Sequence, residues 1–194
     1  MEKGKIVSEC KVLIIGGSAG SLDVLLKIFA ELKTIHSFAL VIVLHRKTAE
    51  DTTLEELIAI KSAIPVKDVE DKTSLLPGYI YIAPSDYHLL FEKNGLLSLD
   101  ISEKVNYSRP SIDVVFESAA DTYGNAVTGI LLSGANADGT QGLIAIKEAG
   151  GVTVVQDPLT AEVPFMPNSA IQHSKPDYIF DVYNLTKFIA QINS

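Results

Sequence analysis

Ser18, His45 and Asp138 each follow a short run of apolar residues of the kind that forms a buried strand. A serine hydroxyl becomes a good nucleophile when a base takes its proton, and an imidazole serves as that base at neutral pH when a third group fixes its tautomer. The three residue types therefore suit a serine hydrolase, with Ser18 as nucleophile, His45 as general base and Asp138 orienting the imidazole. Their order along the chain matches no common triad order, so only geometry can test the assignment.

Backbone N–H groups close to these residues could stabilise negative charge on a reacting carbonyl oxygen. The glycines around Ser18 suit a strand-to-helix turn that presents its hydroxyl, and Ala19 N–H is one candidate donor. Ala135 N–H is a second candidate, because its neighbour Gly134 allows unusual backbone angles.

Each of the three side chains also has a purely structural interpretation. Ser18 could cap the helix expected to start near Gly20, because serine is a preferred N-cap residue. His45 could be a hydrogen-bonded histidine at a strand end. Asp138, which precedes Gly139, could be an ordinary helix cap in a turn. The sequence leaves both interpretations open, and for Ser18 they can coexist.

The elements that must position these residues follow from the hydrophobic pattern. Short apolar runs alternate with amphipathic stretches, which is typical of βαβ units that form a parallel sheet buried on both faces. We therefore expect an α/β fold with a doubly wound, mostly parallel sheet in a Rossmann-like three-layer arrangement. Ligands bind such sheets outside the carboxyl ends of the strands, where the three candidate residues should meet. The expected strands are 12–15, 38–44, 64–69, 127–132 and 152–156, and the expected helices are about 20–32, 53–62, 112–119, 139–149 and 167–173, before a final strand and helix.

The middle of the chain has a different pattern. Pro77-Gly78 precedes the apolar run 79–83, and Lys93-Asn94-Gly95 indicates a turn between 87–92 and 96–101. An Asn-Gly pair between two such runs is typical of β-hairpins. We expect antiparallel strands or a hairpin here, as an addition to the main sheet. Ser111 or Asp113 could then cap the helix that follows.

Composition limits the classes of function. The 194 residues are 47% hydrophobic, and 24 acidic against 16 basic side chains give a net charge of −8. This charge argues against nucleic-acid binding. Cys10 is the one cysteine, so an intramolecular disulfide is excluded. The longest apolar runs are strand-sized and no signal segment is visible, so we expect a cytoplasmic protein without membrane insertion. No histidine pair has metal-ligand spacing, so we expect no metal site.

Short motifs along nearly the whole chain carry a resemblance to a known family. They are residues 14–20, 43–45, 76–84, 87–89, 109–116, 131–134, 138–139, 142–143, 156–158, 166–167 and 169–170. In this order and spacing they resemble the catalytic domain of the chemotaxis protein-glutamate methylesterase family, commonly called CheB. Each motif alone is weak evidence, and together they are specific.

This resemblance implies roles and a reaction. Ser18 would be the nucleophile, His45 the general base and acid, and Asp138 the residue that orients the imidazole. The reaction would be hydrolysis of methyl-esterified glutamate side chains on chemoreceptor-like proteins, with release of methanol and with deamidation of receptor glutamine as a related activity. No cofactor is implied. The implied partners are a methylated chemoreceptor or similar protein and a separate signalling protein of a phosphorelay.

The sequence departs from the family pattern at three places. Arg46-Lys47 stand where the family usually has Met-Pro, and Ala135 replaces a methionine whose backbone helps to form the oxyanion hole. Family members also commonly carry a receiver domain before the esterase. We expect one catalytic domain over residues 1–194 and no receiver domain in this chain. An acidic receptor would need local positive charge to dock, for which Arg46, Lys47 and Arg109 are the candidates.

Two other functions remain open from the sequence. The changed residues after His45 favour an interaction module that keeps the fold with little or no turnover. A nucleotide-binding domain is the other, because Gly-rich turns after a first strand can bind phosphates. However, Gly16, Gly17 and Gly20 do not form G-x-G-x-x-G, and His45 stands where a ribose-binding acid is expected.

Overall fold

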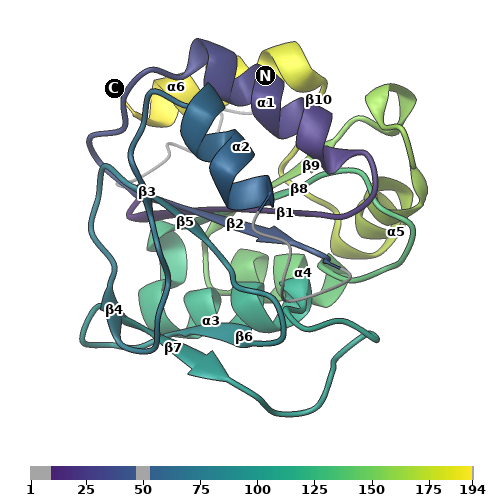
Figure 1. Ribbon diagram of the computed structural model, residues 1–194. Coiled ribbons are helices and arrows are strands. Elements are labelled where there is room, and N and C mark those ends of the chain that lie inside the picture. The colour runs from purple at the N-terminus through teal and green to yellow at the C-terminus, as the bar shows by residue number, and fades with distance from the viewer. Residues whose placement is uncertain (1–9, 47–52, 194) are drawn as a thin grey trace.

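A parallel β-sheet forms the centre of the protein and carries helices on both faces (Figure 1). The computed structural model describes residues 10–46 and 53–193. Over these residues the sheet has seven strands in the order β10-β9-β8-β1-β2-β5-β3, and every pair is parallel. The strands are β1 (Val12–Gly17), β2 (Ala39–Leu44), β3 (Val66–Lys67), β5 (Ile80–Ile82), β8 (Val127–Leu131), β9 (Val152–Gln156) and β10 (Tyr178–Phe180). The expected doubly wound architecture is confirmed.

The central strands are apolar throughout because both faces of the sheet are covered. All residues of β1 and β2 are buried. Leu13 and Ile15 pack into one core and Val12 and Ile14 into the other, as expected from the alternation of side chains along a strand. Figure 1 shows α1 (Ser21–Glu31), α2 (Thr53–Lys61) and α6 (Val182–Ile192) on one face, and α3 (Ile112–Tyr123) and α4 (Thr140–Glu148) on the other, where α5 (Phe165–Ser174) packs against α4.

The strand order reverses at β1, which decides where the loops gather. After β1 the chain builds the sheet outward through β2 and β5, and after α3 it returns to β8 on the other side of β1. Loops that follow β1, β2 and β8 therefore emerge side by side at one edge. Such a switch point is the usual place for a ligand or active site in an open α/β sheet.

A small antiparallel sheet packs beneath α3 (Figure 1). It contains β4 (Thr73–Ser74), β6 (His88–Phe91) and β7 (Leu96–Asp100) in the order β4-β7-β6. The expected hairpin is confirmed, and Gly95 in its turn has a φ of 81°. The expectation was wrong for the run 79–83, because β5 pairs in parallel with β2 and β3 in the main sheet. All three residues of β5 are buried, which is typical of a strand covered on both faces rather than of a hairpin strand.

No helix within residues 10–46 and 53–193 is both long enough and apolar enough to cross a bilayer.

Gly142 allows α3 and α4 to pack closely. A Cβ atom added at Gly142 would lie 2.4 Å from Cβ of Phe116, a separation that real Cβ atoms do not show. We expect Gly142→Ala to lower the free energy of unfolding by about 1–2 kcal/mol, because the overpacking outweighs the better helix propensity of alanine. Urea unfolding at pH 7 measures this. Gln141→Ala, on the exposed side of the same helix turn, should change stability by less than about 0.5 kcal/mol. Equal midpoints for both variants would contradict the packing argument.

Candidate active site

Ser18, His45 and Asp138 lie at the same edge of the sheet. Ser18 follows β1, His45 follows β2, and Asp138 lies in the loop between β8 and α4. Backbone hydrogen bonds tie these segments together: Ser18 N donates to Ser133 O at 2.9 Å, and His45 N donates to Gly17 O at 3.3 Å. The structure thus brings together three residues that are far apart in the chain.

His45 and Asp138 form a direct pair. His45 Nε2 lies 2.7 Å from Asp138 Oδ2, and the side chains are 11% and 0% exposed. An ionised carboxylate has no hydrogen to donate and can only accept a hydrogen bond, so Nε2 carries the hydrogen in this pair. Nδ1 of His45 is then the ring nitrogen that can accept a proton from another group.

Asp138 also caps α3, a helix from a distant part of the chain. Ile112 N donates to Asp138 Oδ2 at 2.7 Å, and Asp113 N and the Ser111 hydroxyl donate to Oδ1 at 3.0 and 2.9 Å. Ser111 occupies the N-cap position of α3, as one of the two expected candidates, but its side chain makes no hydrogen bond to the helix N–H groups. The Asp138 carboxylate takes that role instead. The interpretation of Asp138 as the cap of the helix that follows it was wrong, because Gly139 is the N-cap of α4 and no side chain caps that helix.

Hydrogen bonds stabilise the negative charge of the Asp138 carboxylate. Burial raises the pKa of this carboxyl, but the hydrogen bonds from His45 and from the N–H groups at the start of α3 outweigh burial, so its pKa lies below the ordinary value. The positive end of the helix dipole acts in the same direction. Asp138 is therefore an anion that can orient the His45 ring and stabilise its protonated form.

Ser18 and His45 line one pocket of about 290 Å³. The Ser18 hydroxyl forms no hydrogen bond with any residue that the structure describes, and α1 has Gly20 as its N-cap, with a φ of 81°. The interpretation of Ser18 as the helix cap was therefore wrong. Ser21 fixes the turn instead: its Oγ accepts from Ser18 N at 3.2 Å and donates to Ser133 O at 2.8 Å. The Ser18 side chain is left to face the pocket.

The N–H groups of Ala19 and Ala135 make no hydrogen bond within the described residues, and both residues are exposed. The two segments lie close together, because a Cβ atom added at Gly134 would come within 3.1 Å of Ser18 Cβ. Gly134 is held in place by its N–H, which donates to Val163 O at 3.1 Å. Both amides are thus available as donors near Ser18.

The three basic residues expected to dock a substrate differ in their surroundings. Arg46 lines the Ser18 pocket, and its Nη2 lies 2.5 Å from Glu55 Oε1. Arg109 Nη1 donates to the carbonyls of residues 101 and 102 at 2.9 and 2.8 Å, which holds the segment after β7. Lys47 lies outside the described residues. A docking role for all three stays a prediction.

Asn106 is the residue that the sequence reasoning missed. Its side-chain amide contacts Asp138 Oδ1 at 2.8 Å and Asp113 Oδ2 at 2.7 Å. The only signal in the sequence is that asparagine tolerates left-handed backbone, which indicates a turn and says nothing of a carboxylate 32 residues away.

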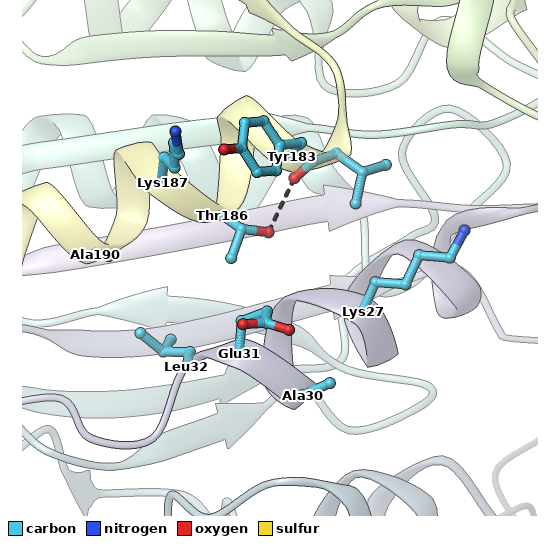
Figure 2. A pocket seen from close by; sticks show the side chains of 9 residues that line it. Lys27, Ala30, Glu31, Leu32, Tyr183, Thr186, Lys187 and Ala190 are labelled. Carbon is cyan, nitrogen blue, oxygen red and sulfur yellow. Dashed lines mark hydrogen bonds between the residues drawn. The ribbon is translucent and has the colours of Figure 1, made fainter.

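A second and larger groove, of about 710 Å³, lies between α1 and α6 (Figure 2). Its lining includes Lys27, Glu31, Tyr183 and Thr186 and pairs no nucleophile with a base. It follows the C-terminal half of α1, which runs away from the edge that carries Ser18. Across the described residues, no three His, Cys, Asp or Glu side chains are grouped so that they could hold a metal ion.

Comparison with known proteins gives consistent matches over this same region. Residues 13–189 match the model of a family described as CheB methylesterase. A protein of Leptospira interrogans named "Putative protein-glutamate methylesterase/protein-glutamine glutaminase" is 40% identical over 183 residues, which are 94% of this chain and 95% of that protein. The protein-glutamate methylesterase/protein-glutamine glutaminase of Thermotoga maritima is 32% identical over 94% of this chain and 54% of its own length. The crystal structure of the Thermotoga maritima CheB methylesterase catalytic domain matches with a TM-score of 0.88 at 30% identity, and covers 95% of this chain and 100% of that domain.

Proposed function

Because this chain belongs to the CheB methylesterase family, we propose that it is a protein-glutamate methylesterase with Ser18, His45 and Asp138 as its catalytic triad. The substrate is a methyl-esterified glutamate side chain on a chemoreceptor or similar protein. The observation that supports this most directly is the 2.7 Å pair between His45 Nε2 and Asp138 Oδ2 beside a pocket that Ser18 also lines.

The first half of the reaction forms an ester between the enzyme and the substrate. His45 Nδ1 takes the proton of the Ser18 hydroxyl as Oγ attacks the ester carbonyl carbon, and Asp138 stabilises the imidazolium through Nε2. Negative charge on the carbonyl oxygen is met by the N–H groups of Ala19 and Ala135. The intermediate then expels methoxide, which leaves as methanol with the proton from His45 Nδ1.

The second half releases the product. Water enters the place that methanol left, gives a proton to His45 Nδ1 and attacks the acyl carbon. The bond to Ser18 Oγ breaks, and Ser18 regains its proton from His45. The products are the free glutamate side chain and methanol. With a glutamine side chain the same route would release ammonia in place of methanol, which is deamidation.

Nucleotide binding gains no support from the loop after β1. A Cβ atom added at Gly20 would lie 3.1 Å from Oε2 of Glu162, so a carboxylate stands directly beside the loop. A phosphate there would meet like charge. An inactive interaction module is disfavoured because the His45–Asp138 pair is formed.

The test of this proposal is methanol release. Purified protein is mixed with a receptor fragment methylated at its glutamates, and methanol and newly exposed carboxylates are counted. Stoichiometric release of both would support the proposal. Binding of the methylated fragment without methanol release would instead favour the interaction module.

We further propose a cytoplasmic role in chemotaxis signalling, regulated by a separate signalling protein.

Arg46 should promote capture of an acidic substrate, and its neighbour Glu55 should weaken it. We expect Arg46→Gln to raise KM about threefold to tenfold and Glu55→Gln to lower it, because the second change frees the guanidinium from its ion pair. The kcat should change little in both variants, and the difference should shrink at high salt because ions screen the attraction. Steady-state kinetics at two ionic strengths measure this. A KM that moves in the same direction in both variants would contradict the docking role.

A further inference from the structure

The side-chain amide of Asn106 joins two buried carboxylates beside the candidate site. Nδ2 donates to Asp113 Oδ2 at 2.7 Å and to Asp138 Oδ1 at 2.8 Å. An amide nitrogen carries two N–H bonds, so it can satisfy both oxygens at once. The proposed mechanism uses Asp138 and gives no role to Asn106 or Asp113.

Asn106 reaches these carboxylates from a surface turn. Val105 and Ser108 exchange backbone hydrogen bonds of 3.1 and 3.0 Å, and between them Asn106 and Tyr107 have φ values of 52° and 61°. Both values lie in the left-handed region, which asparagine tolerates better than most residues. Tyr107 is 98% exposed, and Asn106 is also an exposed residue, but its side-chain amide reaches the buried Asp138. The turn therefore positions one side chain against the buried aspartates.

Asp113 and Asp138 lie close to each other, and Glu117 adds a third acidic group nearby. Burial, followed by the charge of Asp138 and then Glu117, raises the pKa of Asp113 to about 6 against the opposing hydrogen bonds from Gly142 N and Asn106. His45, directly after β2, contacts Asp138. The N–H bonds of Asn106 lie between the two carboxylates and lower their mutual repulsion.

His88 is a further titratable group beside this cluster. It approaches from β6, where its Nδ1 accepts from Ser111 N at 3.3 Å and its Nε2 lies 2.9 Å from Glu103 O.

We propose that Asn106 is a positioning residue of the esterase: its amide orients Asp138 toward His45 and separates the negative charge of Asp138 from that of Asp113. This inference depends on the proposed function, because the orientation of Asp138 matters only if His45 acts as a base. Asn106 touches no reacting atom and acts through Asp138.

Loss of the amide should change the protonation of the linked groups. Without it the two carboxylates repel more strongly and hold a proton to higher pH, so that Asp138 loses its negative charge at a higher pH. This loss of charge removes the active form at low pH. The acidic limb of the pH dependence of kcat/KM, which reports the free enzyme, should therefore move to higher pH.

The experiment compares pH profiles of methanol release from a methylated receptor fragment. Asn106→Gly removes the amide and accepts a φ of 52° without strain. We expect its acidic limb to rise by about one pH unit, so that its kcat/KM at pH values below the limb falls about tenfold. Tyr107→Gly, in the same turn, is the matched control and should stay within about twofold of the wild type. Adding Asp113→Asn to Asn106→Gly should move the limb back, because it removes the second charge.

Three results would overturn the inference. They are an unchanged profile in Asn106→Gly, an equal shift in Tyr107→Gly, and a shift that persists in the double variant. A wild-type chain that releases no methanol would contradict the proposed function instead. In that case carboxyl carbon NMR still tests the bridge, because Asn106→Gly should raise the titration midpoint of the Asp113–Asp138 pair and Tyr107→Gly should leave it in place. Unchanged midpoints would overturn the inference independently of activity.

Discussion

Ser18→Ala is expected to reduce methanol release by roughly a million-fold in kcat, because loss of the nucleophile in a serine hydrolase costs about as much as loss of the whole triad. The fold should be unaffected, since the Ser18 hydroxyl has no hydrogen-bond partner among the described residues. Single-turnover methanol release and thermal unfolding of the same preparation measure the two effects. Hydrolysis at the wild-type rate in this variant would rule out the proposed mechanism.

Ser21→Ala is the matched control for Ser18→Ala, three residues along the same turn. Ser21 is fully buried, and its Oγ links Ser18 N to Ser133 O. Its removal should cost about 0.5–1.5 kcal/mol of stability, because two buried hydrogen bonds are lost while Ser18 N still donates to Ser133 O. The nucleophile is retained, so substantial methanol release should persist. The pair of variants therefore separates loss of chemistry from loss of structure.

Asp138→Asn should lower kcat by about ten-thousand-fold, as expected when the residue that orients a catalytic histidine loses its charge. The geometry explains why. An amide nitrogen facing His45 would donate to Nε2, so the ring hydrogen would move to Nδ1 and that atom could no longer take a proton from Ser18. Burst kinetics measure the acylation step, and the histidine NMR spectrum reports the tautomer. A normal burst with the hydrogen still on Nε2 would contradict this role.

The same variant should also be less stable. The Asp138 carboxylate accepts hydrogen bonds from two N–H groups at the start of α3, and an amide replaces this anion by a neutral group. Charged caps at helix N-termini contribute about 1–2 kcal/mol. Asp23→Asn, an exposed acidic residue in the first turn of α1, is the control and should change stability by less than about 0.5 kcal/mol. Equal losses in both variants would show that Asp138 does not stabilise α3.

Local pattern was enough to predict much of this protein. The continuous apolar runs of β1 and β2 indicated strands buried on both faces, and the alternation with helices indicated a doubly wound sheet. The position of Ser18 and His45 directly after such runs placed them at one edge. These predictions work because burial and turn chemistry act on residues close together in the chain.

Contacts between distant segments were decided only by the tertiary structure. Asp138 caps α3 and not the helix that follows it, because folding brings Ile112 N, 26 residues away, to its carboxylate. β5 joins the main sheet by pairing in parallel with β2, on the side of β2 that faces away from β1. Side-chain directions at the active-site edge of the sheet decide that Nε2 of His45, and not Nδ1, contacts Asp138. They also decide that the Asn106 amide joins Asp113 and Asp138. Hydrophobic periodicity determines which residues are buried and roughly where each element lies, but it carries no information on which buried polar atoms meet.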